Sequence, residues 1–224
     1  MQKAIGFLAM LVIGLCWTGC SSVSTLTIKV NGYTDPGTPG LIKPGGSFCV
    51  IENQETKNPL LETEINGKIT KLLETRGYSV TTHEKADYYL FFGYGMGEPR
   101  SVSTTAPDYY GGFGWGAGYG RGGWGGWGGP SVSIGMPWGG SAGSATLYDR
   151  WLLIKVVEGS AYRTQKISRP VWVGEARSAG TSSDLRMVLN YLLVADFREF
   201  GKNTGQAVTV EIEANNPEAV SLTH

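Results

Sequence analysis

Residues 87–94 read DYYLFFGY, a nearly continuous run of apolar and aromatic side chains. A strand with one face in water alternates between polar and apolar residues, whereas an uninterrupted apolar run indicates a strand that is covered on much of both faces. We therefore predict that this segment is a central strand, with the rest of the domain arranged around it.

Five further segments have the pattern of strands. Upstream, residues 26–30 alternate between apolar and polar side chains, and residues 47–52 follow a loop that is rich in proline and glycine. Downstream, residues 147–157 and 171–177 flank a predicted turn, so we expect these two strands to pair in antiparallel fashion. Residues 208–212 alternate again and form the last predicted strand.

Two segments have the spacing of amphipathic helices. The first is predicted over residues 59–76, because Asn58 can cap free backbone N–H groups and the proline that follows it is suited to a first helical position. The second begins after Ser182 or Ser183, either of which can act as its cap, and Gly201 marks its end. Each helix has one apolar face, which indicates burial against a neighbouring layer.

Together these elements predict an α+β fold of two layers, with a mostly antiparallel or mixed sheet and both helices on one face. We expect a single domain over residues 25–213, interrupted by a long Gly/aromatic loop, a glycine-rich insertion at about residues 95–145. Residues 214–224 are expected to form a flexible tail.

The glycine-rich insertion has an unusual composition. Residues 111–129 contain twelve glycines, five aromatic residues, one alanine and one arginine. Such a segment loses much backbone entropy on ordering and has no aliphatic side chains, so we do not expect it to form a core. Exposed aromatic rings can stack on sugars, peptides or lipid headgroups, and the alternative is a low-complexity insertion without a ligand. The candidate interaction residues are Phe113, Trp115, Tyr119, Trp124 and Trp127.

The first twenty residues have the layout of a signal peptide that ends before a cysteine. Lys3 supplies a positive charge, residues 4–15 are apolar, and the small residues before Cys20 resemble the lipobox of bacterial lipoproteins. We therefore predict a lipoprotein signal peptide over residues 1–19, lipidation of Cys20 and a tether over residues 20–24. A transmembrane anchor is disfavoured because the apolar run is shorter than ~20 residues. Cleavage by an ordinary signal peptidase, which would release a soluble protein, is the alternative.

Composition argues against several classes of function. The chain has 19 basic and 19 acidic side chains and no Lys/Arg cluster, so a nucleic-acid partner is not expected. The two histidines, His83 and His224, are too few for a His-rich metal site or most catalytic triads. Cys49 lies in an apolar stretch, as expected for a buried inert thiol, and Asp149 and Glu175 are expected at the surface of strands. We predict no enzymatic activity, no catalytic residues, no metal and no cofactor.

Several motifs resemble one known family. The sequence ADY at residues 86–88 before an apolar strand, and VWVGEA at residues 171–176, look like the bacterial lipoprotein family catalogued as domain of unknown function 4136. The resemblance spans roughly residues 47–212, without the glycine-rich insertion. It implies an envelope lipoprotein with an α+β domain, and the family has no established catalytic residues to carry over.

Two functions are consistent with these patterns. The first is a non-enzymatic interaction or accessory module, anchored in the membrane by lipid and contacting an envelope protein or polymer. The alternative is a ligand-binding lipoprotein that uses the Gly/aromatic loop to contact glycan or lipid. Because Ser21 follows the cysteine where aspartate favours the inner membrane in bacterial lipoproteins, we expect the protein on the periplasmic face of the outer membrane.

Overall fold

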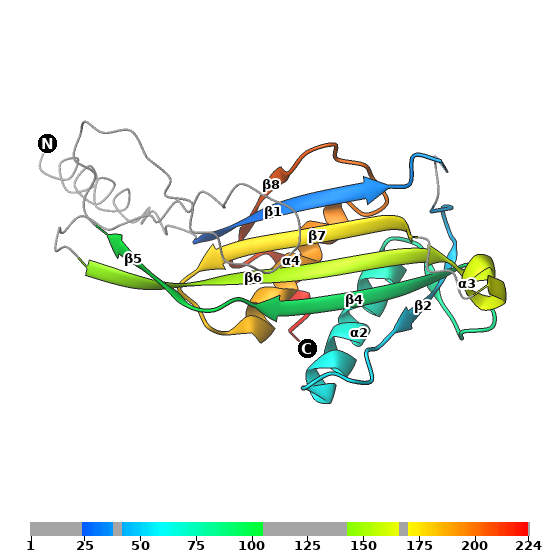
Figure 1. The fold of residues 1–224 in the computed structure, drawn as a ribbon, viewed down its shortest axis with the longest axis horizontal. Helices are drawn as coiled ribbons and strands as arrows, with labels where there is room; N and C mark the ends of the chain where they lie inside the picture. Colours follow the sequence, from blue (N-terminus) through cyan, green and yellow to red (C-terminus); the bar gives the residue numbers. More distant parts are fainter. Residues whose placement is uncertain (1–23, 38–41, 105–142, 166–169, 224) are drawn as a thin grey trace, which may run out of the picture.

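The structure, a computed structural model, describes residues 24–37, 42–104, 143–165 and 170–223, and strands are its most abundant regular elements. The strands are β1 (Thr25–Thr34), β2 (Ser47–Ile51), β3 (Ser79–Val80), β4 (Tyr88–Met96), β5 (Arg100–Thr104), β6 (Gly143–Glu158), β7 (Pro170–Gly180) and β8 (Val208–Glu213). They form one sheet in the order β3-β2-β4-β6-β7-β1-β8, and β5 pairs with β6 (Figure 1). The sheet is mixed, because β2 pairs in parallel with β3 and β4 while the other pairs are antiparallel.

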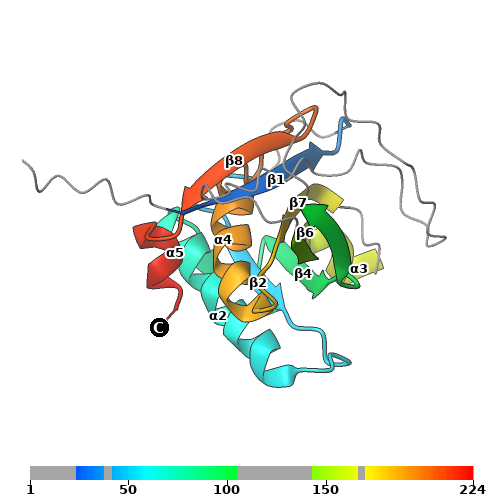
Figure 2. The same ribbon diagram turned by 90° about the vertical axis from the view of Figure 1, so that its left-hand side faces the viewer.

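The helices are α2 (Pro59–Thr75), α3 (Gly159–Gln165), α4 (Leu185–Arg198) and α5 (Pro217–Ser221). Figure 2 shows α2, α4 and α5 together on one side of the sheet, with α3 at the opposite side. The predicted α+β fold with a mixed sheet and two main helices on one face is therefore confirmed.

The central position of the DYYLFFGY segment is also confirmed. It forms most of β4, which lies between β2 and β6. Leu90 is fully buried under the helices, whereas its neighbour Tyr89 is fully buried on the other face, where its ring lies 5.0 Å from that of Tyr162 in α3. Both faces of this part of the strand are covered, as its uninterrupted apolar composition predicts.

Local capping explains where the two long helices begin. Asn58 caps α2 as predicted, because its side-chain oxygen accepts a hydrogen bond from the backbone N–H of Leu61 at 3.1 Å. The predicted cap of α4 was wrong. Asp184, rather than either preceding serine, accepts a hydrogen bond from the backbone N–H of Met187 at 3.0 Å, and its carboxylate suits the positive end of the helix dipole.

Three expectations about loops were wrong. The predicted turn after β6 is the short helix α3, which covers part of the sheet. The tail expected from residue 214 contains α5, and both Ala219 of this helix and Leu222 just after it are buried in the core. This helix begins with an asparagine cap, Asn216, followed by a proline, and α2 begins with the same two residue types. The insertion expected at about residues 95–145 is narrower, because β4 reaches Met96 and β5 pairs with the start of β6.

Strand directions bring several chain segments to one end of the sheet. In the sheet, Arg177 of β7 lies between its two register partners, Lys29 of β1 and Trp151 of β6. Because β1 and β6 run in the same direction, both strands begin on the same side of these three residues. We call this side of the sheet the β1 end; it lies at the left of Figure 1. Because β4 and β7 run antiparallel to β6, they finish at the β1 end, and α4 begins there.

Candidate functional site

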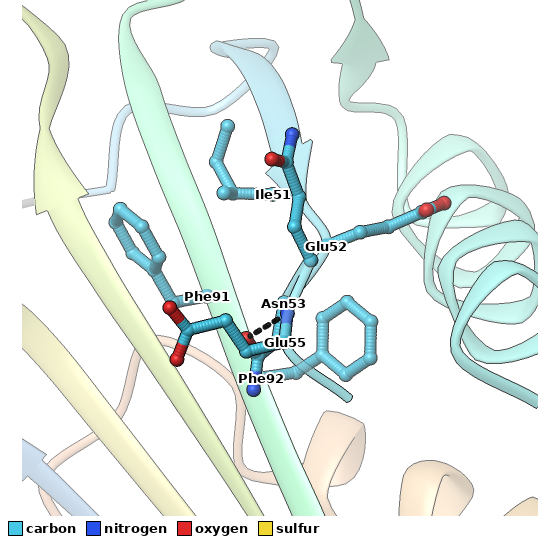
Figure 3. A pocket seen from close by; sticks show the side chains of 7 residues that line it. Ile51, Glu52, Asn53, Glu55, Phe91 and Phe92 are labelled. Atoms are coloured by element: carbon cyan, nitrogen blue, oxygen red, sulfur yellow. Dashed lines mark hydrogen bonds between the residues drawn. The ribbon is translucent and has the colours of Figure 1, made fainter. Parts of the chain in front are cut away.

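A shallow pocket of about 460 Å³ lies where β2 ends beside β4 (Figure 3). Ile51, Phe91 and Phe92 supply its apolar part, and residues 52–55, which follow β2, supply its polar rim. Figure 3 shows the two phenylalanine rings on opposite sides of β4 and the Glu52 carboxylate pointing toward α2.

Hydrogen bonds fix the polar rim against α2. The backbone N–H of Asn53 donates to Glu62 Oε1 at 2.8 Å, and its side-chain oxygen accepts from the backbone N–H of Glu55 at 3.0 Å. Glu52 Oε1 accepts from Asn66 Nδ2 at 2.7 Å. Apolar rings beside fixed polar groups can hold a small or extended ligand by contact, and the ionisable residues of the lining are Glu52 and Glu55.

The pocket borders the open face, which we define as the sheet face opposite α2 and α4 that carries Phe91, Gly95, Trp151, Lys155 and Glu175. Lys155 Nζ lies 5.0 Å from the centre of the Phe91 ring, within the range of a cation–π contact. Trp151 is 40% exposed and lies over Gly95, where a side chain would come within 2.7 Å of the indole ring. Aromatic and basic groups are thus presented together on this face.

The helix-covered face contains a carboxyl group that the sequence analysis did not identify. Asp196 of α4 is fully buried, and neither carboxyl oxygen has a hydrogen-bond partner among the described residues. It fits beneath β7 because Gly174 has no side chain; a Cβ there would lie 2.6 Å from each Asp196 oxygen. Burial raises the pKa of Asp196 well above its usual range, and the charge of Glu175 adds to this effect.

A signal for Asp196 exists in the sequence. Val188, Leu189, Leu192 and Leu193 form the apolar stripe of α4, and Asp196 follows them at i+3 and i+4 spacing. A carboxyl group on the buried stripe of a helix indicates an unusual environment. Periodicity therefore locates this residue, although the glycine that makes room for it comes from a distant strand.

The sequence-predicted interaction residues and the lipidation residue lie outside the described residues. They are Cys20, Phe113, Trp115, Tyr119, Trp124 and Trp127. Their predicted roles therefore stay predictions.

Cys49, His83, Asp149 and Glu175 are described, whereas His224 also lies outside the described residues. Cys49 is half-buried, and burial raises the pKa of its thiol, which favours the unreactive protonated form. His83 is exposed in a turn, and its backbone carbonyl accepts a hydrogen bond from the Tyr89 hydroxyl. Asp149 pairs with Arg100 at 3.0 Å, and its side chain is 47% exposed.

Asp149 and Glu175 are not brought together. They share the open face, but Glu175 lies beside Leu153, four residues along β6 from Asp149. Four residues of a strand span ~13 Å, which is more than the ~5–9.5 Å that separates paired catalytic carboxylates in glycosidases. Across the described ranges, no three His, Cys, Asp or Glu side chains are grouped so that they could hold a metal ion. No described helix has the length and apolar character needed to cross a membrane.

Comparisons with known proteins give one family and distant structural similarities. Residues 41–200 match the family model described as "Domain of unknown function (DUF4136)". A search among curated proteins finds no match. The crystal structure of a PDZ domain protein from Parabacteroides distasonis is 13% identical with a TM-score of 0.43, over 85% of this chain and 40% of that one. The PelC dodecamer from Paraburkholderia phytofirmans is 11% identical with a TM-score of 0.37, over 75% and 94% of the two chains. The chain thus spans about two fifths of the length of the PDZ domain protein.

Proposed function

We propose that this chain is a lipid-anchored lipoprotein of the bacterial cell envelope, because it belongs to the family described as domain of unknown function (DUF4136) and has the predicted signal sequence described above. In this proposal it serves as a non-enzymatic interaction or accessory module. The observation that carries the proposal is the apolar run followed by Cys20, which lies five residues before the first strand, β1.

The physical reason for the anchor is the number of acyl chains. One acyl chain binds a bilayer only marginally, whereas two make the attachment stable. Acylation of Cys20 on sulfur and on its new amino group would supply these chains. The tether would then hold the β1 end of the sheet near the bilayer, because residue 24 leads directly into β1 at that end.

Separation of inner and outer membranes by density tests the anchor. We expect the unaltered chain in the outer-membrane fraction, its loss from that fraction on Cys20→Ala, and its retention in the inner membrane on Ser21→Asp. Cys49→Ala is the matched control, because this thiol lies within the folded domain and its removal leaves the tether intact. An unchanged distribution of Cys20→Ala would contradict the proposal.

A second candidate function is ligand binding by the Gly/aromatic loop, the segment between β5 and β6. What favours it is the position of the two flanking strands: β5 pairs with the first residues of β6, so the chain leaves and re-enters the domain at the β1 end. An anchor at Cys20 would hold the two ends of this segment, Thr104 and Gly143, on the side of the domain that is near the bilayer.

Deletion of residues 111–129 tests this second function. We expect reduced binding to peptidoglycan or to lipid vesicles, and loss of any change in tryptophan fluorescence on adding the ligand. Equal binding by the full chain and the deletion variant would count against the loop as a binding element. Cross-linking in intact cells followed by co-purification of an envelope protein would favour the accessory module.

A further inference from the structure

A second pocket, of about 350 Å³, lies among α2, the first turn of α4 and the residues after α5. Three of its lining side chains are basic, namely Lys68, Lys71 and Arg186, and one, Glu64, is acidic. The lining therefore has two more positive than negative charges. This excess is local, because the chain as a whole has equal numbers of acidic and basic residues.

The base of this pocket is a buried ammonium group. Lys68 is 7% exposed, and its Nζ donates hydrogen bonds to Glu64 Oε1 at 2.5 Å and to Asn190 Oδ1 at 2.7 Å. Asn190 is itself buried in α4. A charged lysine is rarely buried without such partners, so the two helices hold this cation in a fixed position.

Both oxygens of Glu64 are already engaged. Oε2 accepts from Arg186 Nε at 2.6 Å, while Oε1 faces Lys68. Burial acts to raise the pKa of Glu64, but hydrogen bonds and charges from Lys68 and Arg186 lower it overall. The carboxylate therefore stays ionised at neutral pH and neutralises one cation of the three.

Several N–H donors around the pocket remain unused. An arginine has five N–H donors and a lysine has three. Arg186 uses one of them on Glu64, Lys71 uses one on the carbonyl of Ser221 at 2.6 Å, and Lys68 uses two. No other protein partner for these three side chains occurs in the residues that the structure describes. Gly67 leaves the wall between them open, with nothing within 4 Å of where its Cβ would be.

We propose that this pocket binds a phosphate group. A phosphate monoester carries close to two negative charges at neutral pH and offers several acceptor oxygens, which match the excess of two cations and their unused donors. Charge-assisted hydrogen bonds of this kind are about twice as strong as neutral ones.

The position of the pocket favours a lipid headgroup as the source of the phosphate. Arg186 is in the first turn of α4, which begins at the β1 end, and Figure 2 views α2, α4 and α5 from this end. The choice of source rests on the lipid anchor proposed above, whereas phosphate binding itself rests on the pocket alone.

Calorimetric titration of inorganic phosphate into the full chain, purified in a non-ionic detergent, tests the pocket. We expect saturable binding that Arg186→Gln and Lys71→Gln each weaken about tenfold or more. Arg177→Gln, a basic residue of β7 on the open face, is the matched control and should leave binding unchanged. Circular dichroism of each variant checks that it is folded. Absence of saturable binding, equal binding in all variants, or an equal response to sulfate would overturn the proposal.

A soluble short-chain lipid, dihexanoyl phosphatidic acid, distinguishes the two sources. Binding at least tenfold tighter than that of inorganic phosphate, lost in Arg186→Gln, supports the headgroup. Equal affinity for lipid and phosphate overturns the lipid source and leaves a site for free phosphate. Neither result depends on whether Cys20 is acylated, so failure of the anchor and failure of the pocket are separable.

Discussion

Asp196 combines a carboxyl group with complete burial and no hydrogen-bond partner among the described residues. Its pKa is raised in the folded chain, so between about pH 4 and the folded pKa the folded chain binds more protons than the unfolded chain. The free energy of unfolding should therefore fall as pH rises through this range. Asp196→Asn removes this titration, so the stability of the variant relative to the unaltered chain should rise between pH 4.5 and pH 7, as measured by urea unfolding at a series of pH values.

Asp87 provides a control of opposite sign. Its carboxylate accepts hydrogen bonds from the Ser47 hydroxyl at 2.7 Å and the Ser47 backbone N–H at 2.9 Å, and these lower its pKa. The stability that the ionised Asp87 contributes is fully present above the pKa of this group in the unfolded chain. It is lost as the pH falls through the lower pKa of the folded chain. Asp87→Asn should therefore reduce stability at pH 7 more than at low pH. For Asp196 itself, the prediction would be contradicted if the free energy of unfolding depended on pH in the same way in Asp196→Asn and in the unaltered chain.

Single residues were predictable where local chemistry decides their role. Asn58 was identified as a cap because capping involves residues close in sequence. Asp196 was missed because its environment depends on Gly174, which lies on another element. The basic pocket was missed for the same reason, since Arg186 and Lys68 meet only when α4 packs on α2.

Among the elements, α5 gives the sharpest difference from the sequence-based expectation. Leu222, just after this helix, is 2% exposed, and Lys71 of α2 donates to the Ser221 carbonyl. Leu222→Ala should therefore reduce the free energy of unfolding by about 2–5 kcal/mol, measured by chemical denaturation. Val220→Ala is a matched control, because Val220 is 45% exposed. Equal stability of both variants would mean that the tail is not packed.

Two glycines in different elements should respond in opposite directions to alanine. Gly67 lies within α2 with open space around it, so Gly67→Ala should stabilise the chain by about 1 kcal/mol through helix propensity. Gly174 lies in β7 against Asp196 and the Trp172 ring, so Gly174→Ala should destabilise it by about 1–3 kcal/mol. Thermal unfolding of both variants checks the pair, and a stabilised Gly174→Ala would contradict the packing described for Asp196.

Long elements were predictable because periodicity is a local property. The segments predicted as β4, β6, β7, α2 and α4 are all present. The short elements β3, β5, α3 and α5 carry too few residues for a period to be visible. Pairing of β1 with both β7 and β8 depends on tertiary contacts that single segments do not specify.

In the whole molecule, the directions of the strands relate the proposed lipid anchor to the proposed phosphate pocket, because both concern the β1 end of the sheet. β1, which follows the predicted tether, begins at the same end of the sheet as β6 and α4, and α4 carries Arg186. An anchor at Cys20 would place this end toward the bilayer. The fold class was predictable from the sequence, but this common end was not, because it follows from the register of strands far apart in the chain.

Mass spectrometry of the mature N-terminus tests whether the chain is a lipid-anchored lipoprotein. We expect an N-terminal peptide that begins at Cys20 and carries a diacylglyceryl group on sulfur and an acyl chain on the amino group. An unmodified N-terminus downstream of Cys20, or a mature chain that retains residues 1–19, would contradict it.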